Sequence, residues 1–398
     1  MCRRPLPPRG GETERGGLGL SPRAALEDAA PSPPPCPSPS RGEGTRWQRR
    51  APERISISLR GPSGGIHRAG ASTPPTRRDG NGDARPFLSP GGRDASVRRP
   101  ASGATGTCDV IISRICGGLG NQMFQYAVGR RLAQATGEPY RLDLTEMATY
   151  RVHRYGLDQF AIAVPTATPD ELPPPIPKPW SLAALRAALG PRRGTPMPRI
   201  VERTFRFEPA VLAHTGPGHL TGFWQSERYF AESAATIRAD FRLAAPLDAA
   251  RAATLAQIEA STSVSVHVRR GDYVTNPAAN AIHGTCSPEW YEAAIARAVE
   301  GLADPVIFVF SDDPAWVRAN LRLPAGTVFV DPRPDGRDAA DMTLMAAAEA
   351  HVIANSTFSW WAAWLDPRPD ARVVAPARWF AGADHDTSDL IPARWLRL

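Results

Sequence analysis

The sequence has few cysteines and no long apolar run. Its five cysteines are odd in number and include no Cys-x-x-Cys pair, so neither a disulfide framework nor a structural zinc site is expected. They are Cys2, Cys36, Cys108, Cys116 and Cys286. No stretch of about 18 apolar residues occurs, so we expect no transmembrane span. No charged-then-apolar N-terminus marks a secretory signal. We therefore expect a reducing, cytoplasmic setting.

The signatures of several enzyme classes are also missing. The chain has no Gly-x-Ser-x-Gly elbow, no P-loop and no His-x-x-x-His pair. Asp384 and Asp386 have the Asp-x-Asp spacing of metal-dependent sugar transferases, but they lie in a polar loop, so we interpret them as surface residues. Asp312 and Asp313 precede Pro314, where a helix cap is the expected role. We expect no metal site.

The first 108 residues differ in composition from the rest. They hold 17 prolines, 17 glycines, and 18 arginines against 9 acidic residues, whereas residues 109–398 hold 29 basic and 31 acidic residues. A nucleic-acid-binding core would carry the basic excess on its folded part. We expect residues 1–108 to be a disordered, solvated tail or the product of a start codon assigned too early. A basic arm for an anionic partner is the alternative.

Ordered structure is expected from Asp109 onward, in two blocks separated at Pro246. Before Pro246 we expect a strand over residues 110–115 and helices over 122–135, 181–189 and 232–241. After it we expect helices over 247–260, 288–301, 314–321, 341–350 and 357–364, and strands over 263–269, 306–310, 327–330, 351–354 and 372–375. Strands alternating with helices of this length predict parallel sheets covered on both faces. Two such blocks indicate two α/β domains with a cleft between them.

The strand over residues 263–269 carries polar side chains to its carboxyl end. Ser265, His267 and Arg269 share one face, and the intervening valines share the other. In open α/β sheets, ligands bind just beyond the carboxyl ends of strands. Two adjacent arginines there suit a diphosphate, because guanidinium groups pair with phosphate oxygens in bidentate fashion.

The two arginines are expected to have different roles. Arg269 lies on the face of His267, so we expect it to contact the diphosphate. Arg270 points the opposite way, so we expect it to pair within the fold, with Asp272 as a candidate partner. A purely structural Arg–Asp pair at the strand end is an equally open interpretation of this segment.

Two further segments offer groups that bind anions. Ser356 and Thr357 begin a helix, whose free N–H groups and hydroxyls can donate to a phosphate, with plain N-capping as the alternative. The glycine-rich turn that contains Gly118 lets a ligand approach the backbone, and Asn121 and Gln122 either reach that ligand or cap the following helix. We interpret the tryptophans at 360 and 361 as core residues.

Four segments in order resemble a known family. Residues 115–127, 267–273, 310–313 and 355–361 match, in order and spacing, the motifs of bacterial α-1,2-fucosyltransferases, glycosyltransferase family 11. The resemblance covers roughly residues 109–398. It implies a GT-B-like α/β fold in which two Rossmann-type domains face a cleft, with residues 109–246 on the acceptor side and residues 247–398 binding the donor.

The resemblance also implies an activity and roles for single residues. The enzyme would move L-fucose from GDP-β-L-fucose, with inversion and without a metal, to the 2-hydroxyl of a terminal galactose. Arg269 would hold the β-phosphate, and His267 would lie at the nucleotide. Asp341 would bind guanine, and Ser356 and Thr357 would hold phosphate.

No catalytic base follows from the resemblance. The related α-1,6-fucosyltransferases have a glutamate where this sequence has Asn276-Pro277. Asp272 and His283 are the candidates, and a mechanism without a strong base is the alternative.

The acceptor is expected to be a galactose-terminated glycan of O-antigen or another surface polysaccharide. A lipid-linked acceptor would place the enzyme at the inner face of the membrane. Two other classes stay open. One is another nucleotide-sugar transferase or a dinucleotide enzyme on the same fold. The other is a binding protein whose basic tail engages nucleic acid or membrane, although it would leave the region after Asp109 unexplained.

Overall fold

The computed structural model describes residues 109–149, 152–174, 197–382 and 385–398. The tail over residues 1–108, the helix expected over residues 181–189 and Asp384 lie outside the described residues. Among the helices that are described, none is both long and apolar enough to cross a membrane.

The first sheet has four parallel strands in the order β2-β1-β4-β3. They are β1 (Ile111–Arg114), β2 (Tyr140–Asp143), β3 (Arg199–Val201) and β4 (Gly218–Thr221). The helical elements of this part are α1 (Leu119–Thr136), η1 (Leu157–Gln159), α3 (Pro209–Leu212), η2 (Glu227–Tyr229), η3 (Ala231–Ser233) and α4 (Ala234–Asp240). Only β1 was expected from the sequence, because strands of three or four residues are too short for an apolar pattern to show.

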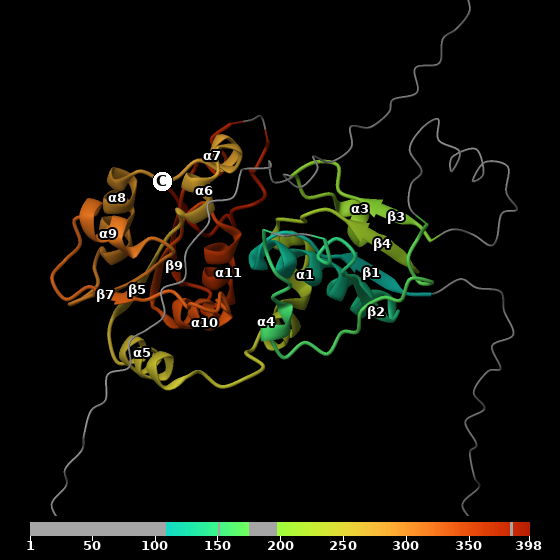
Figure 1. Cartoon of the computed structure of the whole chain (residues 1–398), viewed down its shortest axis with the longest axis horizontal. Helices are drawn as coiled ribbons and strands as arrows, with labels where there is room; N and C mark the ends of the chain where they lie inside the picture. Colours follow the sequence, from blue (N-terminus) through green and yellow to red (C-terminus); the bar gives the residue numbers. More distant parts are fainter. Residues whose placement is uncertain (1–108, 150–151, 175–196, 383–384) are drawn as a thin grey trace, which may run out of the picture. The chain divides into compact units, whose positions relative to one another are not determined.

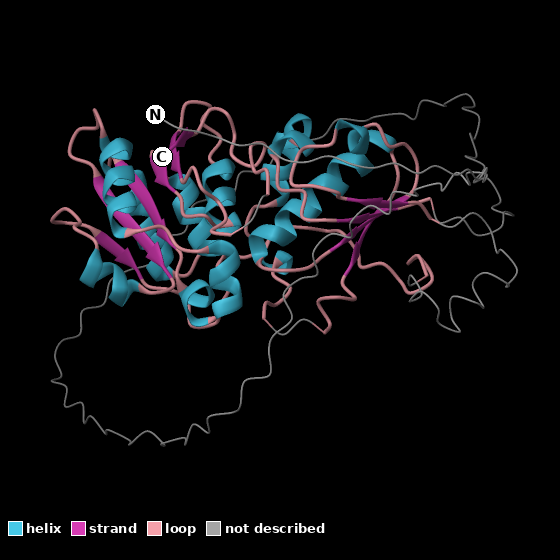
Figure 2. Cartoon of the chain, turned by 90° about the horizontal axis from the view of Figure 1, so that it is seen from above, coloured by secondary structure: helices cyan, strands magenta, loops and turns pink. Residues whose placement is uncertain are grey.

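The second sheet has six parallel strands in the order β10-β9-β8-β5-β6-β7. They are β5 (Ser263–Val268), β6 (Val306–Ser311), β7 (Val328–Val330), β8 (Ala350–Val352), β9 (Arg372–Ala375) and β10 (Leu396–Arg397). Its helices are α5 (Ala249–Glu259), α6 (Gly271–Thr275), α7 (Pro277–His283), α8 (Pro288–Val299), α9 (Pro314–Asn320), α10 (Ala339–Ala347) and α11 (Thr357–Leu365). Figure 2 shows strands and helices in separate colours.

Helices cover both faces of the second sheet. Along β6, Ile307 and Val309 pack in one buried cluster with α8, whereas Phe308 and Phe310 pack in the other cluster with α10 and α11. All six residues of β5 are buried. Burial on both faces is the usual state of a parallel sheet. The predicted α/β class with parallel sheets is confirmed.

Side-chain caps begin several helices where the sequence predicted them. The Ser287 hydroxyl accepts a hydrogen bond from the Trp290 N–H at the start of α8, and the Asp313 carboxylate accepts one from the Trp316 N–H at the start of α9. Asn276 caps α7 in the same way. The short helices α6 and α7 were not expected, and they supply two of the candidate site residues.

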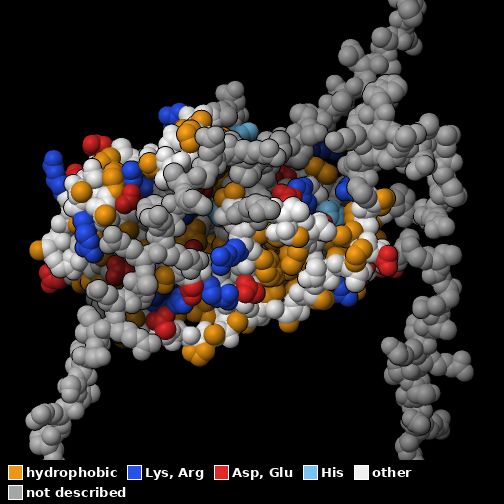
Figure 3. All heavy atoms as spheres, viewed as in Figure 1, with side chains coloured by type: hydrophobic (Ala, Val, Ile, Leu, Met, Phe, Trp, Pro, Cys, Tyr) orange, Lys and Arg blue, Asp and Glu red, His pale blue; other side chains and the backbone are white. Residues whose placement is uncertain are grey.

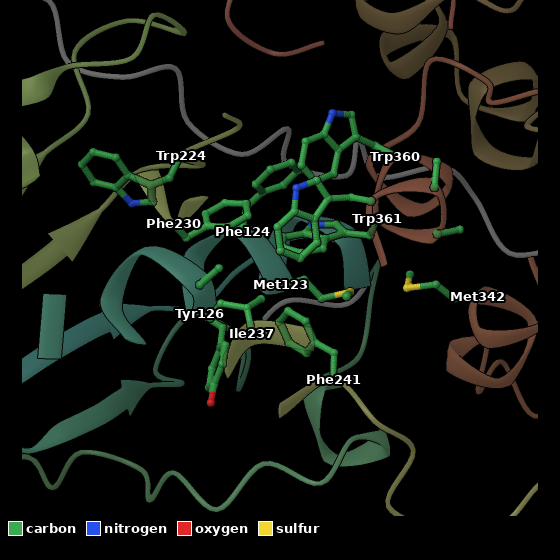
Figure 4. Packing of buried hydrophobic residues seen from close by; sticks show 14 of the residues in the cluster. Met123, Phe124, Tyr126, Trp224, Phe230, Ile237, Phe241, Met342, Trp360 and Trp361 are labelled. Carbon is green, nitrogen blue, oxygen red and sulfur yellow. The ribbon is translucent and has the colours of Figure 1, made fainter. Parts of the chain in front are cut away.

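Helices α1 and α11 lie side by side and share an aromatic core (Figure 1, Figure 4). The ring of Phe124 lies 4.5 Å from that of Trp360 and 4.9 Å from that of Trp361, and both tryptophans are fully buried. The Trp361 Nε1–H donates to the Gly120 carbonyl at 2.9 Å. The interpretation of both tryptophans as core residues is confirmed. The domain boundary at Pro246 stays a prediction, although it separates the strands of the two sheets in the sequence.

Candidate active site

His267 lies at the carboxyl end of β5 and is buried, with 6% of its surface exposed. Its ring packs 5.4 Å from that of Phe358, the second residue of α11, and its Nδ1 has no hydrogen-bond partner among the described residues. Burial, together with the positive charge of Arg269, lowers the pKa of His267 to about 3. The imidazole is therefore neutral at physiological pH and can bind a ligand only as an uncharged group.

Arg269 follows β5 and is held between two carboxylates. Its Nη2 lies 2.5 Å from Asp272 Oδ1, and its Nη1 lies 3.0 Å from Asp312 Oδ2. The side chain is 26% exposed. Two partners on different elements fix the plane of the guanidinium, which is the arrangement that a bidentate contact with phosphate needs.

Arg270 pairs within the fold, but the expected partner, Asp272, was wrong. Its Nε pairs with Asp313 at 3.2 Å, and its guanidinium lies 3.8 Å over the ring of Trp316. Asp272 pairs with Arg269 instead, from the first turn of α6, which begins at Gly271.

His283, at the end of α7, stacks on Tyr273 beside Arg269. The two ring centres are 4.5 Å apart and the planes differ by 5°. The Arg269 guanidinium lies 5.4 Å from the Tyr273 ring centre. Burial lowers the pKa of His283. The positive charge of Arg269 lowers it further, and the carboxylate of Asp272 raises it. The structure thus brings Arg269, Asp272 and His283 together.

The N-termini of α1 and α11 meet next to this cluster. A Cβ built on Gly120 would lie 2.4 Å from the Thr357 carbonyl carbon, so only glycine allows this approach. The Ser356 hydroxyl makes no capping hydrogen bond to α11. The Tyr273 hydroxyl donates to the Asn355 carbonyl at 3.4 Å, which ties the start of α11 to α6. Two helix ends with free N–H groups favour an anion here.

The polar residues that follow the glycine-rich turn contact other parts of the protein. Gly118 faces the ring of His153, which a Cβ would approach to 3.7 Å. Asn121 Oδ1 accepts from Gln225 Nε2 at 3.0 Å. Gln122 is fully buried and donates to the Gly117 carbonyl at 2.8 Å. Gln122 therefore holds the turn from inside and neither reaches a ligand nor caps the helix, because its side chain points into the protein.

Asp341 lies in the first turn of α10, which begins at Ala339, two residues before the expected start. Its Oδ1 accepts from Arg251 Nε at 2.7 Å. Burial raises the pKa of Asp341, and Arg251 opposes that shift. Asp338 is the N-cap residue of α10, and the pKa of its carboxyl is raised by burial and by Asp341, with Arg269 opposing the shift.

Three residues near Arg269 were missed as site residues. His153 comes from a loop after β2, and its pKa is lowered by burial, raised by Asp272 and lowered by Arg269, which places it close to both. Tyr273 lies inside a recognised motif but was given no role, and Asp312 was expected to be a helix cap, whereas it pairs with Arg269. No sequence signal marks His153, since it follows no periodic element.

Within the described ranges, no group of three or more His, Cys, Asp or Glu side chains could hold a metal ion. Asp386, one half of the Asp-x-Asp spacing, pairs with Arg206 at 2.7 Å. Cys116 and Cys286 are not joined in a disulfide.

Comparison with known proteins assigns the chain to a family. The model of Glycosyl transferase family 11 matches residues 208–395. The chain is 32% identical over 305 residues to an α-1,2-colitosyltransferase of Escherichia coli, an overlap that covers 73% of this chain and 99% of that protein. The chain belongs to glycosyltransferase family 11.

This family 11 glycosyltransferase is also similar to other known proteins. It is 38% identical over 140 residues to the O-antigen biosynthesis glycosyltransferase WbnK of Escherichia coli, covering 35% of this chain and 46% of that protein. It is 38% identical over 106 residues to the mouse galactoside 2-α-L-fucosyltransferase Sec1, covering 26% and 28%. A crystal structure of NodZ α-1,6-fucosyltransferase soaked with GDP-fucose is similar with a TM-score of 0.42 and 19% identity, over 70% of this chain and 100% of that one.

Proposed function

We propose that this glycosyltransferase transfers L-fucose from GDP-β-L-fucose, with inversion, to the 2-hydroxyl of a terminal galactose. The observation that carries the proposal is the Arg269 guanidinium, held by Asp272 and Asp312 beside the N-termini of α1 and α11. The names of relatives support the α-1,2 linkage and the synthesis of O-antigen. An acceptor carried on a lipid would bring the enzyme to the inner face of the membrane.

In the proposed reaction, the 2-hydroxyl oxygen of the acceptor forms a bond to C1 of fucose. The bond between C1 and the β-phosphate oxygen breaks, and its electron pair leaves with GDP. Arg269, the N–H groups at the start of α11, and the hydroxyls of Ser356 and Thr357 stabilise the charge that grows on the diphosphate. A preorganised cationic fork gives this stabilisation without a metal ion.

The proton of the attacking hydroxyl needs an acceptor within the same cluster. Asp272 and His283 are the two candidates, and both lie beside Arg269. Burial lowers the pKa of His283, which favours the unprotonated imidazole that a base needs but also weakens it as a base. Gly118 and Asn121 complete the donor site from the α1 side, with His267 at the nucleotide.

Asp341 is the proposed guanine-reading residue. A carboxylate accepts two adjacent N–H groups of guanine, which uracil cannot offer. Pairing of Oδ1 with Arg251 leaves lone pairs for this, because each carboxylate oxygen has two. Asp341→Asn is expected to weaken GDP binding by about 2–5 kcal/mol, as removal of one partner from a buried charged pair does.

Arg251→Met provides the matched control for Asp341. If Asp341 reads the base, Asp341→Asn weakens GDP binding far more than Arg251→Met does, as measured by calorimetry on folded proteins. Equal losses in both variants would mean that the ion pair with Arg251, and not the base, is the function of Asp341.

The proposal is tested with purified protein, GDP-fucose and a β-galactoside such as lactose. The expected product is a fucosylated galactoside, with its α-1,2 linkage established by mass and linkage analysis. The 2-deoxygalactoside should accept no fucose. Transfer to the 2-deoxy compound, or binding of UDP or NAD in preference to GDP in a fluorimetric titration, would contradict the proposal.

Colitose is the second candidate donor sugar. The similarity to an α-1,2-colitosyltransferase along 99% of that protein favours it. Colitose is L-fucose without the 3-hydroxyl, so the two GDP sugars differ by one polar group. Direct competition between GDP-fucose and GDP-colitose would decide, since a site that hydrogen-bonds the 3-hydroxyl rejects the analogue without it.

A further inference from the structure

A row of aromatic rings leads away from Arg269 along one side of the candidate site. Tyr273 and His283 stack next to the guanidinium. The His283 ring lies 5.6 Å from that of Phe380, and the Phe380 ring lies 5.3 Å from that of Phe205. We call Tyr273, His283, Phe380 and Phe205 the aromatic row.

Hydrogen bonds to backbone carbonyls hold the middle of the aromatic row in place. Asn355 Nδ2 donates to the carbonyls of His283, at 2.9 Å, and Trp379, at 3.2 Å. The Ala381 N–H donates to the Ile282 carbonyl at 2.9 Å. Asn355 lies two residues before α11. The segment that forms the candidate phosphate site therefore also holds the rings in place.

The far end of the aromatic row lies at the surface. Phe205 is only partly buried and belongs to neither hydrophobic core cluster. Its ring contacts are Phe380 and the exposed His385, at 4.7 Å. The rings of Phe205 and Phe380 meet at 57°, so they do not cover each other's faces. A partly exposed aromatic ring outside the core can offer part of its face to a ligand.

Ion pairs neutralise the charges beside Phe205. Arg206 pairs with Asp386 and Asp389, each at 2.7 Å, and Arg228 pairs with Asp389 at 2.8 Å. These two arginines and two aspartates balance each other in charge. Arg378, beside Phe380, donates to the carbonyls of Phe380 and Ala381, so one positive charge also lies at this rim. The ring faces themselves carry no charge, which suits an uncharged sugar.

We propose that the aromatic row binds the acceptor glycan by stacking against the C–H face of a sugar ring. A hexopyranose has hydroxyls around its edge and C–H groups on its faces, and these partly positive hydrogens are attracted to the negative face of an aromatic ring. Because the row begins at Tyr273, beside Arg269, a glycan that lies along it can present a hydroxyl to the donor. This inference rests on the proposed function, since it concerns the acceptor of the same reaction.

The test compares Phe205→Ala, Phe205→Leu and Phe205→Trp, with GDP-fucose as donor and lactose as acceptor. Phe205→Ala and Phe205→Leu should raise the KM for lactose about tenfold, the effect expected from loss of one stacking contact. Phe205→Trp should keep the KM for lactose near that of the wild type, because tryptophan has an aromatic ring. Leucine keeps an apolar surface but has no ring, so Phe205→Leu separates stacking from apolar contact. GDP affinity and the hydrolysis of GDP-fucose without acceptor should not change in any variant.

Phe329→Leu is the control, because Phe329 is a partly buried ring on β7 and should leave the KM for lactose unaltered. An unchanged KM in Phe205→Ala, or an equal rise in Phe205→Trp, would overturn the inference. So would a loss of GDP affinity in Phe205→Ala. Absence of any transfer by the wild-type enzyme would instead contradict the proposed function.

Discussion

Arg269 and Arg270 are neighbours in the sequence but are held by different groups. Arg269 is fixed by carboxylates on α6 and after β6, with one quarter of its side chain exposed. Arg270 stacks on Trp316 and pairs with Asp313 at the start of α9. The first arrangement keeps a guanidinium available to a ligand, and the second uses it within the fold.

Lysine substitution should separate these two roles. Arg269→Lys should unfold at a temperature close to that of the wild type but lower kcat by roughly 10²–10³-fold, because an ammonium keeps the charge and loses the planar fork. Arg270→Lys should lower the unfolding free energy by about 1 kcal/mol through loss of the stacking on Trp316. Thermal unfolding and steady-state kinetics measure both. Near-wild-type turnover by folded Arg269→Lys would remove Arg269 as the phosphate ligand.

The burial of His267 predicts a pH dependence of stability. Its pKa is about 3 in the folded chain and about 6.5 when unfolded, so the unfolded state binds one more proton between these values. The stabilisation from neutral His267 is therefore complete above pH 6.5 and is lost as the pH falls toward 3, at about 1.4 kcal/mol per pH unit. His267→Gln should show a shallower loss of stability between pH 6 and 4 in denaturant titrations. An unchanged slope would contradict the burial of His267.

At the scale of elements, the approach of α1 to α11 decides the geometry of the candidate site. Gly120 lies against the backbone of Thr357, and Trp361 donates to the Gly120 carbonyl. The two helix N-termini come together only if no side chain separates them at this point.

A matched pair of glycine substitutions tests this contact. Gly120→Ala should lower the unfolding free energy by roughly 1–3 kcal/mol and reduce activity, because the new methyl group overlaps the Thr357 backbone. Gly118→Ala adds a methyl group at an unstrained 3.7 Å from His153 and should cost about 0.5–1 kcal/mol, the loss expected from alanine at an N-cap position. Chemical denaturation compares the two. Equal stability of both variants would mean that the helices separate freely.

At the scale of the whole molecule, the balance of charge and the need for a metal ion can be tested. Basic and acidic side chains both occur on the face shown in Figure 3, in keeping with the near balance of charge over residues 109–398. We propose that catalysis needs no metal. Excess EDTA should therefore leave the rate unchanged within about twofold, since arginine and helix ends supply the positive charge. Abolition by EDTA with recovery on adding Mn²⁺ would point to Asp384 and Asp386 as ligands.

The tail is tested by removing it. A chain that begins at Thr107 should fold and transfer sugar like the full chain, because the composition changes at Asp109 and the tail carries none of the family motifs. Circular dichroism and the transfer assay compare the two proteins. Loss of folding or of activity in the shorter chain would make residues 1–108 part of the enzyme.

The sequence by itself determined the α/β class, most elements of the second sheet and the candidate residues at the end of β5. Those elements have strong local signals: an alternating strand, proline-initiated helices with Ser287 and Asp313 as caps, and an apolar helix with paired tryptophans. Strands β2, β3 and β4 had no such signal, since three or four residues with polar side chains resemble a loop.

Only the tertiary structure decided which groups meet. The partner of Arg269 depends on where α6 begins, and the partner of Asp341 is Arg251, 90 residues away in the sequence. Gly120 is needed for the approach of α11, 237 residues later, which no local pattern expresses. Periodicity and caps report the energetics of neighbours along the chain, whereas a site is made by contacts between distant segments, whose pairing depends on the packing of the whole molecule.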